Sequence, residues 1–249
     1  MDVTDKNMSS RDSPEPRNNF ILSQVPKAEY RRIAPKLEYV PLSLGEVIYE
    51  TGQEKAHVYF PVDGIISIIE ILEDGASSEL ALIGKEGMLG ISAVLGGKSE
   101  TSRAVVQSDG GAYHLPAKIL VEEFHGSGRL MELILLYIQI RYTQVAQTAV
   151  CNRHHNLQQQ LCRWLLLSLD RTESNDISMT QELIAGMLGV RREGITRAAG
   201  ELQKQGVIEY RRGSITVVDR QRLEELSCEC YEACKRETNR LLQIQKTIG

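Results

Sequence analysis

The feature that most restricts the fold is the apolar spacing within residues 179–219, MTQELIAGMLGVRREGITRAAGELQKQGVIEYRRGSITVVD. With Gln181 taken as the first helical position, small and apolar residues fall where two crossed helices would share a core. They are Ile184, Ala185, Leu188, Val190, Ile195 and Ala198. Gly189 stands at the turn, where a positive φ angle is inexpensive only for glycine, and Thr180 is a suitable N-cap. These features in one register predict a helix-turn-helix. The alternative is a helical hairpin whose arginines are only solvated surface.

Two β-prone runs follow the second helix. Residues 207–210 (VIEY) and 214–218 (SITVV) flank Arg211, Arg212 and Gly213. A glycine-containing turn between such runs predicts a β-hairpin, here with two cations near its tip. A basic hairpin beside the second helix is placed to meet phosphates. The segment therefore predicts a winged helix-turn-helix that binds double-stranded DNA.

The N-terminal end of the second helix gathers side chains suited to base edges. Arginine presents two parallel donors that match guanine O6 and N7, and a carboxylate can accept from cytosine N4. We take Arg192, Glu193 and Arg197 as candidate base-reading residues; an i,i+4 ion pair with Arg197 is the alternative role of Glu193. The full set of DNA-binding candidates is Arg191, Arg192, Glu193, Thr196, Arg197, Thr180, Gln181, Arg211 and Arg212.

The charge balance of the chain has to be divided by region. The 249 residues hold 29 Lys and Arg against 33 Asp and Glu, a net charge of −4, which taken alone disfavours nucleic acid. Residues 191–212 hold six Lys and Arg against three Glu, so this stretch carries +3. A net-negative chain with its cations on one groove-facing surface remains compatible with DNA, and the acidic remainder weakens non-specific binding.

Other classes of protein find little support. The sequence contains no Gly-x-Ser-x-Gly, Walker, Gly-x-Gly-x-x-Gly or His-Glu-x-x-His motif, so we expect no enzyme, no catalytic residue and no cofactor. The apolar runs are shorter than the ~18 residues of a membrane span, and the N-terminus has no apolar core. Five cysteines, an odd number, argue against a disulfide framework and for the reducing cytoplasm.

The rest of the chain divides by its periodicity. Residues 38–126 contain short Val-, Ile- and Tyr-rich runs separated by glycines, which predicts an antiparallel sandwich or barrel. From Arg129 the period becomes helical, with a coiled-coil-like seam of Met131, Ile134, Ile138, Tyr142, Val145 and Ala149. We interpret this seam as a homodimer interface; an intrachain core helix is the alternative.

With these features, the chain resembles the Crp/Fnr family of bacterial transcription regulators. Residues 192–197 (REGITR) are similar to the recognition-helix pattern of the family, in which an arginine and a glutamate precede a second arginine. Residues 45–48 (GEVI), Gly52, residues 58–60 (VYF) and Gly64 resemble the glycine-marked strands of its cyclic-nucleotide-binding-like barrel. The resemblance implies an α+β fold: an N-terminal antiparallel, jelly-roll β-barrel, a long dimerisation helix and a C-terminal winged helix-turn-helix.

The resemblance also sets the expected organisation. It implies an effector-controlled homodimer that binds a palindromic operator with half-sites ~34–36 Å apart, with RNA polymerase as a candidate partner. The expected units are a disordered tail (1–19), the sensor barrel (20–127), the dimerisation helix (128–153), the winged helix-turn-helix domain (154–220) and a C-terminal helix (221–249).

The effector site departs from the cyclic-AMP-binding members of the family. Where those members carry a phosphate-binding Gly-Glu pair and, later, Arg-Ser, this chain has Leu89-Gly90 and Glu100-Thr101. A carboxylate where a phosphate would lie is repulsive, so we do not expect cyclic AMP as the effector. The candidate effector-pocket residues are Glu86, Gly87, Gly90, Thr101 and Arg103.

The cysteines suggest a further alternative. Cys228, Cys230 and Cys234 would suit a redox- or metal-sensing regulator, since relatives in this family sense oxygen through cysteine-ligated clusters. On a continuous helix, however, Cys228 lies about 200° from Cys230, which is poor geometry for one metal ion. Cys151, His154 and His155 form a second group without an evident fourth ligand. We therefore expect structural cysteines and no metal site. A ligand-binding regulator that acts through protein contacts is the other alternative.

Overall fold

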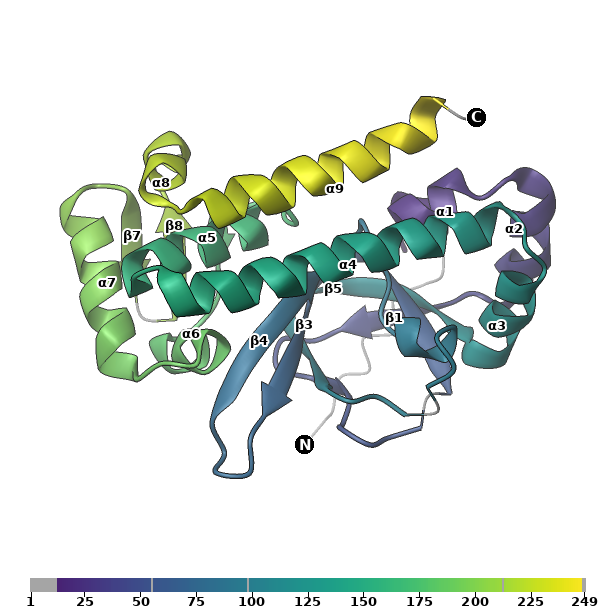
Figure 1. Ribbon diagram of the computed structural model, residues 1–249, viewed down its shortest axis with the longest axis horizontal. Helices are drawn as coiled ribbons and strands as arrows, with labels where there is room; N and C mark the ends of the chain where they lie inside the picture. Colours follow the sequence, from purple (N-terminus) through teal and green to yellow (C-terminus); the bar gives the residue numbers. More distant parts are fainter. Residues whose placement is uncertain (1–12, 55, 98, 212, 248–249) are drawn as a thin grey trace, which may run out of the picture.

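The computed structural model describes residues 13–54, 56–97, 99–211 and 213–247. Small N-terminal helices precede an antiparallel sheet, which is followed by one long helix, a winged helix-turn-helix and a C-terminal helix that runs back along the long helix (Figure 1). This is the predicted α+β fold. No helix in these ranges is long and apolar enough to cross a membrane.

The N-terminal half is built around the sheet. Its strands are β1 (Glu38–Leu42), β2 (Val47–Tyr49), β3 (His57–Ile71), β4 (Ser77–Ile83) and β5 (Arg103–Pro116). Its helices are α1 (Phe20–Gln24), α2 (Lys27–Ile33) and α3 (Ala117–His125), with 3-10 turns at Pro16–Asn18, Ala34–Lys36 and Ile91–Ala93.

Strand β5 is the centre of the sheet. It pairs with β1 and β2 on one side and with β3 on the other, and β4 continues the sheet beyond β3 in the order β1-β5-β3-β4. All pairings are antiparallel. Gly64, with φ 75°, lies where the β3–β5 register shifts, and a Cβ there would come within 2.7 Å of Ser108 O. Such irregularities bend long strands. The described sheet therefore curls over its core but remains open, where the sequence led us to expect a closed barrel.

Strand β3 is apolar along most of its length because both its faces are covered. Ile66 and Ile68 face a cluster inside the curled sheet, together with residues of β1, β2 and β5. Ile65 and Ile69 face the other way and join a second cluster that includes the helices of the C-terminal half. Successive strand residues point to opposite faces, so one strand serves two cores.

The long helix α4 (Arg129–His154) crosses this second face (Figure 1). Tyr137 and Ile134 are buried, and Arg141 donates to Leu82 O of β4. The C-terminal helix α9 (Glu229–Thr247) lies along another side of α4, where Gln139 donates to Glu237 at 3.1 Å. The third side of α4 faces solvent.

The C-terminal half contains α5 (Leu157–Leu169), α6 (Gln181–Leu188), α7 (Arg192–Lys204) and α8 (Arg220–Leu226), with a small sheet of β6 (Asp176–Ile177), β8 (Ser214–Val217) and β7 (Ile208–Arg211) in that order. Its core is continuous with the upper face of the large sheet, since Ile65, Ile69 and Leu82 pack in the same cluster as Trp164 and Ile195. Ser77 of β4 also donates to Gly186 O of α6 at 3.0 Å. The winged helix-turn-helix is thus docked on the large sheet.

Both terminal segments differ from the sequence expectation. Of residues 1–19, which we expect to be a tail, residues 1–12 lie outside the described part, whereas Asn19 is fully buried and donates to Pro61 O and Gly87 O. The segment expected as one C-terminal helix is two, because the chain becomes extended at Ser227 (ψ 170°) before α9 begins at Glu229.

Candidate nucleic-acid interface and neighbouring sites

The two helices of the helix-turn-helix have the local structure that their sequence predicts. Thr180 caps α6 by accepting a hydrogen bond from Leu183 N, and Gly189 ends the helix with φ 65°. Ile184 and Ile195 are fully buried between the helices, and Ala185 is buried beside them. The turn between the helices thus holds α7 rigidly across α6.

The N-terminal end of α7 presents charged side chains to solvent. Arg191, Arg192, Glu193 and Arg197 are all exposed, while Ile195 points into the core. Among the described side chains no ion pair is seen between Glu193 and Arg197, and both side chains face solvent. Thr196 instead holds the two helices together, because its hydroxyl lies 2.6 Å from Gln181 Oε1. Thr196 and Gln181 therefore position α7.

The predicted wing is present as the β7–β8 hairpin. Ile208 pairs with Val217 and Arg211 with Ser214, and Gly213 in the turn has φ 82°. Arg211 is exposed and lies 3.3 Å from Glu209. Arg212 falls outside the described residues. The hairpin follows the C-terminal end of α7 and shares a hydrophobic core with it, so the exposed Arg211 belongs to the same folded unit as α7.

Comparison with known proteins gives this arrangement a family. Residues 39–125 match the model described as "Cyclic nucleotide-binding domain", and residues 159–226 match "Crp-like helix-turn-helix domain". The chain belongs to the Crp/Fnr family of transcription regulators. Regulators of the Crp/Fnr family bind DNA through the helix-turn-helix and act as dimers.

Three relatives of this Crp/Fnr protein share between 18% and 22% of its residues. The global nitrogen regulator of Synechococcus elongatus is 22% identical over 183 residues, covering 70% of this chain and 82% of that protein. A protein of Eubacterium rectale described as a Crp/Fnr-family transcriptional regulator has a TM-score of 0.68 at 20% identity, covering 84% of this chain and 98% of that one. FixK2 of Bradyrhizobium japonicum has a TM-score of 0.67 at 18% identity, covering 77% and 98%. At 18–20% identity, these two solved structures show that the fold is shared.

The five candidate effector-pocket residues make contacts in different parts of the sheet. Glu86 lies 2.8 Å from Arg171 Nε, beside the C-terminal half. Gly87 faces the Tyr137 ring, and Gly90, with φ 99°, packs on Val58. Thr101 is exposed, and Arg103 pairs with Glu50 at 3.0 Å. Of these five residues, Glu86 lines the cavity between α4, α5 and α9, and the other four are not part of its wall.

The region where cyclic-AMP-binding relatives would hold the phosphate is also different. Glu100 accepts a hydrogen bond from Ser92 Oγ at 3.0 Å, and its backbone oxygen accepts from Gly52 N. An apolar cluster that includes Tyr49, Ile66 and Leu89 lies inside the curled sheet. The acidic side chain therefore sits in its own hydrogen-bonded environment, at the place where the sequence gives reason to doubt a nucleotide phosphate.

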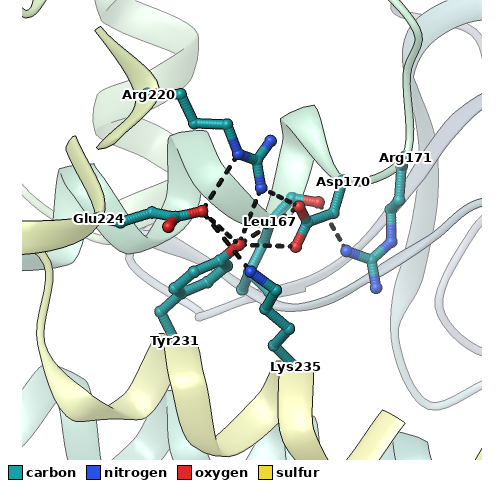
Figure 2. A network of polar contacts seen from close by, with 7 residues as sticks. All are labelled: Leu167, Asp170, Arg171, Arg220, Glu224, Tyr231 and Lys235. Atoms are coloured by element: carbon teal, nitrogen blue, oxygen red, sulfur yellow. Dashed lines mark hydrogen bonds and ion pairs between the residues drawn. The ribbon is translucent and has the colours of Figure 1, made fainter. Parts of the chain in front are cut away.

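A cavity lies instead where α4, α5 and α9 meet. Its volume is about 290 Å³, and its wall includes Glu86, Gln144, Arg171, Cys234 and Lys235. Figure 2 shows the polar network beside it, in which Asp170 accepts from Arg220 and Tyr231, and Arg171 donates to Leu167 O. Of the candidate effector residues, Glu86 is the one that reaches this cavity. Sequence spacing could not find it, because its wall comes from four distant segments.

The exposed side of α4 is apolar. Leu135 is 47% exposed, Tyr142 76% and Val145 38%, and Ala149 is exposed as well. With Ile138 these residues follow spacings of three and four, which makes one seam. Five of the six predicted seam residues are exposed or partly exposed, but Ile134 is fully buried in the N-terminal core. Leu135 takes its place at the surface.

A group of sulfur and nitrogen donors lies at the end of α4. The donor atoms of Cys151, His155, Cys228 and Cys230 all lie within 4.8 Å of one another. The Cys151 thiol is 3.5 Å from Cys228 Sγ, and this hydrogen bond lowers the pKa of Cys228 and raises that of Cys151. Cys234 does not join them; it is buried in the main core. Two residues from each of the groups recognised in the sequence therefore form one cluster.

On a continuous helix the side chains of Cys228 and Cys230 would point about 200° apart. Cys228 precedes the first residue of α9, however, so its side chain is not held in that direction. Residues 151–155 supply two of the four donors, Cys151 and His155, and Cys228 and Cys230 supply the other two, 73 or more positions later in the sequence. The missed signal was the pairing of Cys-x-x-x-His with Cys-x-Cys.

Proposed function

We propose that the protein is a homodimeric transcription regulator that reads a palindromic operator with the exposed end of α7. The observation that carries the proposal is the set of solvent-facing Arg191, Arg192, Glu193 and Arg197 on a helix held rigidly by the helix-turn-helix core. Arg192 and Arg197 suit guanine edges, and Glu193 suits cytosine N4. The wing at Arg211 and the start of α6 at Thr180 lie next to the backbone of such a duplex.

Homodimerisation is supported by the apolar seam on α4. In a two-fold dimer the seam of one chain, centred on Tyr142 and Val145, would pack on the same seam of its partner. Each of these side chains is more than a third exposed in the single chain. Two-fold symmetry would place two recognition helices ~34–36 Å apart, on successive turns of the major groove.

Control by an effector would act through the contact between the sensor sheet and the winged helix-turn-helix. The two halves share a core through Ile65, Ile69 and Leu82, and Ser77 bonds to α6. A ligand that binds one arrangement of these halves better than another would shift the population of DNA-competent dimers. The carboxylate of Glu100 and the apolar cluster inside the sheet support a ligand other than cyclic AMP. RNA polymerase remains a candidate partner of the DNA-bound dimer.

The test is a DNA-binding titration with matched arginine variants. On the operator obtained by selection, Arg192→Ala should weaken binding by about 1–3 kcal/mol per half-site and relax one base preference. Arg236→Ala removes an exposed arginine from α9 and should leave affinity unchanged. If Arg192→Ala lowers affinity equally on all sequences, Arg192 is a phosphate contact. If the protein binds no duplex above a random background, a regulator acting through protein contacts is the better description.

A further inference from the structure

Four potential metal ligands lie together where α4 meets α9: Cys151 and His155 at the end of α4, and Cys228 and Cys230 around the start of α9. We propose that these four residues bind a single tetrahedral Zn²⁺ ion. Three thiolates and one imidazole are a common donor set of structural zinc sites. The three cysteines are buried and His155 is half-buried, so the ion would be enclosed.

The spacing of the donor atoms fits one small ion. Zn–S bonds of ~2.3 Å in a tetrahedron place the sulfurs about 3.8 Å apart. Cys151 Sγ lies 3.5 Å from Cys228 Sγ, and Cys230 Sγ lies 3.7 Å from His155 Nδ1. In an iron–sulfur cluster the four protein ligands are divided among two or four iron atoms, so as a set they spread farther apart than four donors that share one ion. The compact arrangement therefore favours a mononuclear site.

The histidine is oriented as zinc-bound histidines usually are. Its Nδ1 faces the cysteines, while its Nε2 lies 3.2 Å from Glu229 Oε2. A carboxylate that accepts from the outer nitrogen fixes the tautomer and orients the ring toward the metal. Gln160 also donates to His155 O at 2.8 Å, which holds the backbone at the end of α4. The neighbouring His154 is exposed and has neither arrangement among the described contacts.

The surroundings also supply the balancing charge. Three thiolates and Zn²⁺ carry a net charge of −1, which is costly to bury alone. Arg163 of α5 is 4% exposed, its Nε has no hydrogen-bond partner among the described residues, and its charge acts on Cys151 and Cys230. The positive charge of Arg163 would balance the −1 charge of the zinc–thiolate centre, so that each lowers the cost of burying the other. The ion would join the end of α4 to α9 immediately before α5 begins.

The experiment is metal analysis of the full-length protein, purified under reducing conditions without chelator. We expect one zinc per chain, and in a cobalt-substituted sample the thiolate-to-cobalt charge-transfer and tetrahedral visible bands. His155→Ala and Cys228→Ser should lose the metal. His154→Ala and Cys162→Ser, which remove a neighbouring histidine and a buried cysteine outside the cluster, should retain it.

A milder variant guards against misfolding. Glu229→Ala leaves all four donors in place and should lower zinc affinity about 10–100-fold, measured by competition with a chromophoric chelator. The proposal is overturned if reduced, folded protein takes up neither zinc nor cobalt, if it holds iron with acid-labile sulfide, or if His154→Ala and His155→Ala behave alike. A Cys151–Cys228 disulfide in protein that takes up no metal after reduction would also overturn it. The readout is metal content, so its failure leaves the proposed DNA-binding function untouched.

Discussion

A buried glutamate between the large N-terminal sheet and α5 makes the stability of the fold depend on pH. Glu79 of β4 accepts from Trp164 Nε1 at 3.1 Å and lies 2.7 Å from Ser67 Oγ. Ser67 lies 3.1 Å from Gln107 Oε1, Gln107 donates to Ser168, and Ser168 donates to Trp164 O. A serine hydroxyl has one proton to donate. A protonated Glu79 can donate to Ser67, whose own proton then reaches Gln107 and closes the ring of hydrogen bonds.

The direction of the pH dependence follows from burial. Burial raises the pKa of Glu79 from its ordinary 4.5 to about 7, although Ser67, Arg163, Arg171 and Trp164 act in the opposite direction. The folded state therefore keeps a proton that the unfolded state releases, so stability is fully present below pH 4.5 and falls as pH rises to about 7. The separation of the two pKa values corresponds to about 3 kcal/mol of unfolding free energy.

Glu79→Gln tests this reasoning, because the amide keeps the shape and can donate to Ser67 at every pH. We expect the variant to match the wild-type protein at pH 4.5 and to be more stable by about 3 kcal/mol at pH 8. Urea unfolding at fixed protein concentration, followed by the fluorescence of Trp164, measures both. Glu122→Gln, which removes an exposed carboxylate, should keep the wild-type pH profile. Parallel profiles for wild type and Glu79→Gln would refute the account.

Two further predictions concern packing and assembly. Gly87→Ala places a methyl group 2.1 Å from the buried Tyr137 ring and should lower the unfolding free energy by about 1–3 kcal/mol or more. Gly200→Ala lies in open space on α7 and should raise the unfolding free energy by about 0.5–1 kcal/mol. Thermal or urea unfolding measures both variants, and equal effects would contradict the clash at Gly87. Tyr142→Glu places a charge in the exposed seam of α4 and should yield monomers in sedimentation analysis. Glu132→Gln changes an exposed side chain of the same helix and should leave the dimer intact. A dimeric Tyr142→Glu variant would exclude the seam as the interface.

The sequence predicted the elements whose signals are local. The cap at Thr180, the positive φ of Gly189 and the buried Ile184 and Ile195 lie within a few turns of one another, so their spacing sufficed. The hairpin around Gly213 is local for the same reason. Where contacts between distant segments determine which side chain is buried, the apolar spacing of the sequence was not enough to predict it. Ile134 and Leu135 are adjacent apolar residues, and only the position of α4 on the sheet determines which one is buried.

The candidate sites show the same division. The exposed arginines of α7 were predictable because the helix-turn-helix template fixes which face is buried. The cysteine cluster was not, because it depends on the break at Ser227 and on α9 returning along α4. The cavity beside Glu86 likewise needs four segments to meet. A single sequence carries no local signal for such meetings.

Selection from random double-stranded DNA with the full-length protein, followed by binding of Arg192→Ala and Arg197→Ala to the selected duplex, tests directly whether α7 reads an operator. We expect a palindrome whose half-sites lie one helical turn apart, ~34–36 Å, with each variant relaxing a different base position in both halves. Enrichment of no motif, or variants that leave every base preference unchanged, would contradict this role of α7.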